Sequence, residues 1–101
     1  MTARLALTAD ELAIVRQVLS AHLPKSALVH AFGSRATGRS KPWSDLDLAI
    51  DAGSALSLEC LAALAEAFDE SALPWKVDLV DCATISSEFG KLIDDAKISV
   101  N

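Results

Sequence analysis

The sequence is poor in basic residues and in aromatic side chains. It contains no tyrosine, only 5% aromatic residues, and nine Lys and Arg against fourteen Asp and Glu, which gives a net charge of −5. A chain with this balance lacks the basic footprint of proteins that bind long polyanions, so we expect no long nucleic-acid groove. A local group of basic residues would still suffice for one small phosphorylated ligand.

Cysteines and long apolar runs are also scarce. Cys60 and Cys82 stand apart in apolar stretches, and we interpret them as reduced packing residues of a cytosolic protein. Neither histidine clusters with them, so no zinc site is expected. No apolar run approaches the ~20 residues that cross a membrane, and the start, MTARLALTADEL, lacks the apolar core of a signal peptide. We therefore expect a cytoplasmic protein that makes no membrane contact.

The length of 101 residues predicts one domain over 1–101. Helical and strand patterns alternate along it, and a capping box at Thr8 and Glu11 opens a first helix that ends near Leu23. Strands are predicted over 27–32, 45–51, 76–80 and 97–100, and further helices over 53–68 and 84–96. This order predicts an α/β (α+β) sandwich, in which a small sheet of three to four strands packs with helices. The high apolar content, 51%, fits either an Ala- and Leu-rich core or an apolar surface for a partner.

Asp45 and Asp47 form the first part of a candidate site. They are two residues apart in a predicted strand, so their side chains share one face while the apolar residues around them point to the other. Adjacent carboxylates repel unless a cation lies between them, and a set of oxygen ligands suits a hard cation such as Mg²⁺. Taken alone, a solvated Asp-x-Asp at the start of a strand would be the better explanation.

Asp78 changes that balance because it interrupts the apolar strand KVDLV, where a carboxylate is costly unless it is paired or coordinated. If the two strands are neighbours, Asp78 joins Asp45 and Asp47 on one face, and the three carboxylates form a binding site for two divalent ions. Asp81 points to the opposite face of its strand and is interpreted as a strand-end or cap residue. Asp51 lies about 13 Å beyond Asp47 and is left out of the site.

Gly33 and Ser34 directly follow a predicted buried strand. A glycine lets the backbone approach a phosphate, and Ser34 offers a hydroxyl and an N–H. Arg35 adds positive charge, so we group it with Gly33 and Ser34 as nucleotide-binding residues. A polar loop with an incidental Gly-Ser pair is the plain alternative. Trp43, in the loop before Asp45, is expected to be a buried anchor of that loop, with stacking on a base as the other option.

These residues together resemble a known family. Gly33-Ser34, ten intervening residues and Asp45-x-Asp47 resemble the signature of the nucleotidyltransferase superfamily of DNA polymerase β. The small size and the downstream VDLVD segment resemble its minimal nucleotidyltransferase (MNT, MntA-type) members, which are often antitoxins paired with a HEPN-domain toxin. The resemblance covers the chain from about residue 27 onward and implies the polymerase β-like nucleotidyltransferase fold with a mixed sheet.

The resemblance also implies roles for the residues. Asp45, Asp47 and Asp78 would be catalytic and would hold two Mg²⁺ ions, while Gly33 and Ser34 would bind the phosphates of ATP. The implied reaction transfers a nucleoside monophosphate, expected to be AMP from ATP, to a hydroxyl of a partner, expected to be a HEPN-domain toxin. The chain would then be a protein adenylyltransferase and an antitoxin.

Two other functions stay open at this stage. The chain could neutralise its toxin by contact without catalysis, but three retained aspartates favour catalysis. It could instead modify a small molecule such as an antibiotic. We expect no second domain to build an acceptor pocket, which counts against that function, although a homo-oligomer could supply one.

Overall fold

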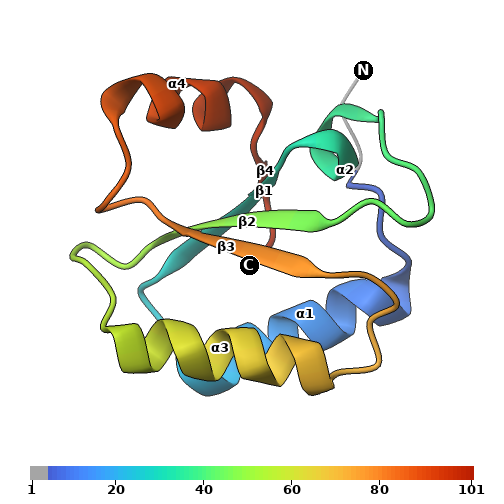
Figure 1. Ribbon diagram of the computed structural model, residues 1–101, viewed down its shortest axis with the longest axis horizontal. Helices are drawn as coiled ribbons and strands as arrows, with labels where there is room; N and C mark the ends of the chain where they lie inside the picture. Colours follow the sequence, from blue (N-terminus) through green and yellow to red (C-terminus); the bar gives the residue numbers. More distant parts are fainter. Residues whose placement is uncertain (1–4) are drawn as a thin grey trace.

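The computed structural model describes residues 5–101 as a four-stranded sheet with helices on both faces (Figure 1). The elements are α1 (Ala9–His22), β1 (Leu28–Phe32), α2 (Ser34–Thr37), β2 (Leu46–Asp51), α3 (Leu58–Glu70), β3 (Val77–Asp81), α4 (Ser87–Ala96) and β4 (Ile98–Ser99). Helices α1 and α3 lie together against one face of the sheet, and α4 lies on the opposite side (Figure 1). The predicted α/β sandwich is confirmed.

The strands follow the order β3-β2-β1-β4. Strand β1 is antiparallel to β2 and β4, whereas β2 and β3 are parallel, so the sheet is mixed as expected. A parallel pair needs a crossover connection, and α3 supplies it between β2 and β3. Strand β3 therefore lies at one edge, and β2 lies between β1 and β3.

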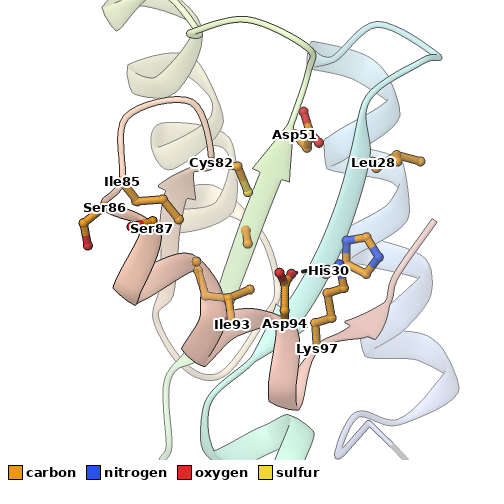
Figure 2. A pocket seen from close by; sticks show the side chains of 12 residues that line it. Leu28, His30, Asp51, Cys82, Ile85, Ser86, Ser87, Ile93, Asp94 and Lys97 are labelled. Atoms are coloured by element: carbon orange, nitrogen blue, oxygen red, sulfur yellow. Dashed lines mark ion pairs between the residues drawn. The ribbon is translucent and has the colours of Figure 1, made fainter.

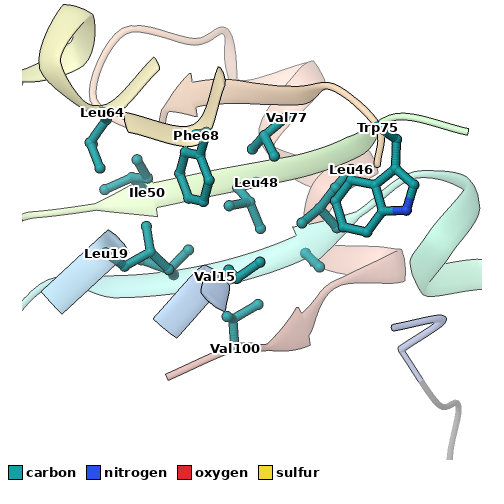
Figure 3. Packing of buried hydrophobic residues seen from close by; sticks show 12 residues of the cluster. Val15, Leu19, Leu46, Leu48, Ile50, Leu64, Phe68, Trp75, Val77 and Val100 are labelled. Atoms are coloured by element: carbon teal, nitrogen blue, oxygen red, sulfur yellow. The ribbon is translucent and has the colours of Figure 1, made fainter. Parts of the chain in front are cut away.

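The core lies between the sheet and the pair of helices α1 and α3. Leu46, Leu48 and Ile50 of β2 are fully buried there, and they meet Leu64 and Phe68 of α3 (Figure 3). Burial of each such side chain contributes about 1.5–3 kcal/mol. Because strand residues alternate, this packing orients Asp47 of β2 toward the opposite face.

Side-chain caps fix where the helices begin. The capping box at α1 is present, with the Thr8 N–H donating to Glu11 Oε1 at 2.9 Å and the Glu11 N–H donating to Thr8 Oγ1 at 3.1 Å. Ser57 caps α3 by accepting the Cys60 N–H, and Ser86 caps α4 by accepting the Phe89 N–H. Both helices therefore begin later than their sequence patterns predict. Within residues 5–101, no helix has the length and apolar character that a membrane crossing demands.

Candidate active site

The chain turns sharply at Gly33, between β1 and α2. Gly33 has a φ of 73°, a left-handed conformation that favours glycine, and a Cβ at this position would collide with the carboxylate of Asp47. Phe32, the preceding residue, is the register partner of Asp47 across the β1–β2 pair. The Gly-Ser turn and the Asp-x-Asp segment are therefore in direct contact, and glycine is required where they meet.

Asp47 and Asp78 lie side by side on neighbouring strands. They are register partners in the parallel β2–β3 pair, and adjacent strands are about 4.8 Å apart, so the predicted adjacency of these two strands is confirmed. Burial raises the pKa of Asp47 above its ordinary value, and the carboxylates of Asp78 and Asp45 raise that pKa further. Negative charge is thus concentrated around a partly desolvated carboxyl group.

Asp45 and Asp78 remain more accessible than the core around them. Asp45 is exposed just before β2 begins, and the Asp78 Oδ1 atom pairs with Lys76 Nζ at 3.4 Å. Among residues 5–101, no three His, Cys, Asp or Glu side chains are arranged as a ready metal-ligand group. The structure therefore brings Asp47 and Asp78 together with Asp45 nearby, while convergence of all three on one ion remains a prediction.

The donor chemistry of this site fits a hard divalent cation. The pKa of Asp47 is raised by burial and by the neighbouring carboxylates of Asp78 and Asp45. A cation between these carboxylates would replace their mutual repulsion with attraction. Carboxylate oxygens are also the ligands that Mg²⁺ prefers. Asp45, Asp47 and Asp78 are the residues that would hold such an ion.

Arg35 does not take the position that the sequence suggested. Its side chain is 5% exposed, and its guanidinium donates to the backbone oxygens of Ser44 (2.9 Å), Ala6 (2.9 Å) and Pro42 (3.2 Å). The guanidinium also stacks on Trp75, 4.3 Å from the ring centroid. With its donors engaged inside the protein, Arg35 is not free to bind a phosphate, and its predicted role in nucleotide binding is not supported.

Arg35 instead joins three segments of the site. It belongs to α2 immediately after Ser34, it holds Ser44 next to Asp45, and it stacks on Trp75 just before β3. The sequence does not reveal this arrangement, since the partners of Arg35 are backbone oxygens and one distant ring. We infer that Arg35 is a positioning residue for the Gly-Ser turn and the aspartates.

The two tryptophans have opposite environments. Trp75 is buried under Arg35, whereas Trp43 is 72% exposed and has Lys41 Nζ 5.6 Å from its ring centroid. The prediction that Trp43 is a buried loop anchor is wrong, because Arg35 anchors this loop through backbone oxygens instead. Trp43 is thereby left available to an external contact.

The two aspartates left out of the site have structural partners. Asp81 is 5% exposed and accepts the N–H groups of Leu56 (2.7 Å) and Ala83 (3.0 Å), as expected for a cap residue. Asp51 accepts the Gly53 N–H at 3.0 Å. It also lines a cavity of about 310 Å³ under α4 (Figure 2).

The cavity under α4 occupies the same face of the sheet as Asp47. Its polar lining includes His30, Asp51, Cys82, Asp94 and Lys97 (Figure 2). Burial and the nearby Lys97 lower the pKa of His30, against the opposing effect of Asp94 and Asp51. The lining of the cavity also includes Ala49, two residues from Asp47 along β2, but none of the three aspartates of the candidate site.

Comparison with known proteins gives consistent results. A probable protein adenylyltransferase MntA from Haemophilus influenzae is 47% identical over 91 residues, which cover 90% of this chain and 79% of that protein. A crystal structure described as a toxin-antitoxin with AMP-PNP superposes with a TM-score of 0.76 at 28% identity, over 89% of this chain and 72% of the other. A mutant of the toxin-antitoxin MntA-HpeT gives a TM-score of 0.72 at 28% identity, over 92% and 71% of the two chains.

The family assignment follows from the site and from these matches together. The nucleotidyltransferase domain family matches residues 12–100, which include the Gly-Ser turn, the Asp-x-Asp segment and Asp78. The resemblance noted in the sequence is thereby confirmed: this chain belongs to the nucleotidyltransferase domain family.

Proposed function

We propose that this chain transfers AMP from ATP to a hydroxyl group of a partner protein, and that this partner is a HEPN-domain toxin which the transfer silences. One observation carries the proposal: the Gly33 turn abuts Asp47, and Asp47 lies beside Asp78. A phosphate-binding turn and a carboxylate group thus meet at one point. The similarity to a probable protein adenylyltransferase and to toxin-antitoxin structures, one with AMP-PNP, supports the same function.

Each residue of the site has a distinct task in this reaction. The backbone at Gly33 and the hydroxyl and N–H of Ser34 hold the phosphates of ATP, with the missing side chain of Gly33 leaving room beside Asp47. Asp45, Asp47 and Asp78 would hold Mg²⁺, and the bound ion would supply positive charge beside the acceptor hydroxyl and the leaving pyrophosphate.

The transfer itself is an in-line displacement at the α-phosphorus of ATP. The acceptor oxygen forms a new bond to this phosphorus, and the bond from phosphorus to the bridging oxygen of pyrophosphate breaks. Asp78 is the candidate to accept the proton of the acceptor hydroxyl. Lys76 Nζ lies 3.4 Å from the Asp78 Oδ1 atom and pairs with it beside the site.

The proposal is tested by following the α-phosphate. The purified chain is incubated with ATP labelled at this phosphate, Mg²⁺ and a HEPN-domain toxin protein. We expect label on the partner with the wild type, and a loss of at least about 100-fold in Asp47→Ala because several kcal/mol of charge stabilisation disappear. Asp51→Ala, on the same strand and face, is the matched control and should keep the activity.

Neutralisation by contact alone is the second candidate function. Exposed apolar side chains near the candidate site favour it: Trp43 is 72% exposed and Leu58 85%. The same experiment separates the two functions. If Asp47→Ala neutralises the toxin fully, with no label on it, contact explains the antitoxin activity and the catalytic proposal fails.

A further inference from the structure

An apolar groove runs along the edge of the sheet next to Asp78. We name it the α3–β3 groove, and it has a volume of about 450 Å³. Its apolar lining comes from α3 and β3, namely Leu58, Leu61, Ala62, Ala65, Val77 and Leu79. Lys76 and Asp78 complete its lining. Leu58 is 85% exposed, so this end of the groove presents a large apolar side chain to solvent.

The backbone of β3 is open on the groove side of the sheet. Strand β3 is an edge strand whose one neighbour is β2. Lys76 O accepts the Leu46 N–H, and the Cys82 N–H donates to Ile50 O, so the even-numbered residues around this strand face β2. Because backbone groups alternate along a strand, those of Val77 and Leu79 point to the open edge, where an extended peptide could add a strand.

If the proposed function holds, the geometry of the reaction places the acceptor hydroxyl at the β3 edge of the sheet. The pyrophosphate leaves from the Gly33–Ser34 turn, at the end of β1. An in-line attack comes from the opposite side of the α-phosphorus. With the phosphorus held at Asp47 of β2, the opposite side is that of Asp78 and β3. The acceptor hydroxyl therefore reaches the site across the β3 edge.

Charge around the groove indicates which segment would fit. Helix α3 carries four acidic residues and no Lys or Arg over Leu58–Glu70, and Asp45 and Asp78 add further negative charge at the site. Lys76 is the one basic residue in the groove lining. An apolar groove in acidic surroundings is complementary to an extended segment whose apolar residues are flanked by Lys or Arg.

We propose that the α3–β3 groove docks such a basic-flanked, extended segment of the partner protein, which pairs with the edge of β3 and delivers its hydroxyl to Asp78. The partner's apolar side chains lie against Leu58, Leu61 and Ala65. The acceptor chain thus binds separately from ATP, on the other side of the carboxylates from the Gly-Ser turn.

The first test places charge in the groove. Ala62→Glu and Ala65→Glu change two exposed positions of α3 at which Glu is a good helix former. Leu92→Glu on α4, 70% exposed, is the control outside the groove. With the same HEPN-domain protein as probe, we expect the groove variants to weaken its binding at least about tenfold. Leu92→Glu should bind as the wild type does, and stabilisation by ATP with Mg²⁺ should be unchanged in all variants.

The binding and transfer measurements separate this inference from the proposed function. If the wild type binds the probe but transfers no label, the proposed function fails. The docking inference is then tested by comparing the affinity of the groove variants for the probe with that of the wild type. If the groove variants bind and react with the wild-type KM for the probe, the docking inference is overturned even when Asp47→Ala is inactive. A raised KM with an unchanged kcat supports docking in the groove.

A second test identifies the occupant directly. A photo-reactive phenylalanine at Leu58 should cross-link to a partner peptide that carries Lys or Arg beside apolar residues, and the same group at Leu92 should not. Cross-links from Leu58 to a second copy of this chain, to an acidic segment, or to nothing would each contradict the inference.

Discussion

The two faces of β2 differ in chemistry although they alternate along six residues. Leu46, Leu48 and Ile50 are fully buried against α1 and α3, whereas Asp47 faces the other side and touches the Gly33 turn. One face is packed and apolar, and the other concentrates negative charge. The difference teaches that a single short strand can carry both core residues and a carboxylate of the candidate site. Along β2, we therefore expect substitutions at the even-numbered residues 46, 48 and 50 to affect stability, and a substitution at Asp47 to affect activity.

The largest effect on stability is expected on the core face. Leu48→Ala should lower the free energy of unfolding by about 2–5 kcal/mol, because it removes apolar contacts and leaves a cavity. Urea unfolding measures the loss, and Asp51→Ala on the other face of the same strand is the control. A loss no larger than in the control would show that the two faces do not differ in the way described.

A substitution at Gly33 tests the contact between the Gly33 turn and Asp47 of β2. Gly33→Ala should cost about 1–3 kcal/mol, because alanine is strained at a φ of 73° and its Cβ would collide with Asp47. Gly38→Ala is the matched control, since Gly38 has a φ of 79° but no atom within 4 Å of a built Cβ. Gly38, with a ψ of 13°, is in the αL region, whereas Gly33 has a ψ of −157°, so the difference in unfolding free energy between the two variants measures the collision together with the greater backbone strain at Gly33. Equal costs would contradict this account.

Asp47 should destabilise the fold when it is ionised. Its raised pKa means that the folded chain holds the proton more tightly than the unfolded chain, so stability falls as pH rises from the unfolded pKa through the folded pKa. Asp47→Asn should therefore stabilise the metal-free protein at neutral pH, by less than about 1 kcal/mol because the site is partly screened by solvent. Thermal unfolding in a chelator should show this gain at pH 7 and its loss in acid. A gain that is independent of pH would contradict this cause.

The smallest effect is expected on the exposed side of α4. Leu92→Ser on α4 changes a side chain that is 70% exposed, so its unfolding free energy should stay within about 0.5 kcal/mol of the wild type. Chemical denaturation checks this value. A larger loss would mean that the exposed side of α4 contributes to packing.

Local sequence patterns were sufficient for the fold and for the adjacency of the main residues. Alternation in DLDLAI predicts which face Asp47 takes, and the costly Asp78 in an apolar strand predicts its neighbour. The helix around Gly90 forms despite the glycine, because Ser86 caps it and Ile93 is buried. These features depend on interactions between residues that are close in the sequence, so local patterns are enough to predict them.

Two residues could not be interpreted from local patterns. The charge of Arg35 predicts a place in a phosphate site, but its partners are backbone oxygens up to 29 residues away. The large aromatic side chain of Trp43 predicts a buried loop anchor, yet the side chain is exposed and Arg35 anchors the loop instead. Such partners become visible only when distant segments are brought together.

The anchoring of the loop by Arg35 has a consequence for protein engineering. Arg35 holds the Ser44 oxygen, and the Lys41 N–H donates to Ser44 Oγ at 2.8 Å, so the last part of the connection is fixed independently of its total length. Residues 38–40 are the part between α2 and this fixed turn. A reporter peptide inserted there should leave both halves of the site in place, since lengthening a flexible loop costs little free energy.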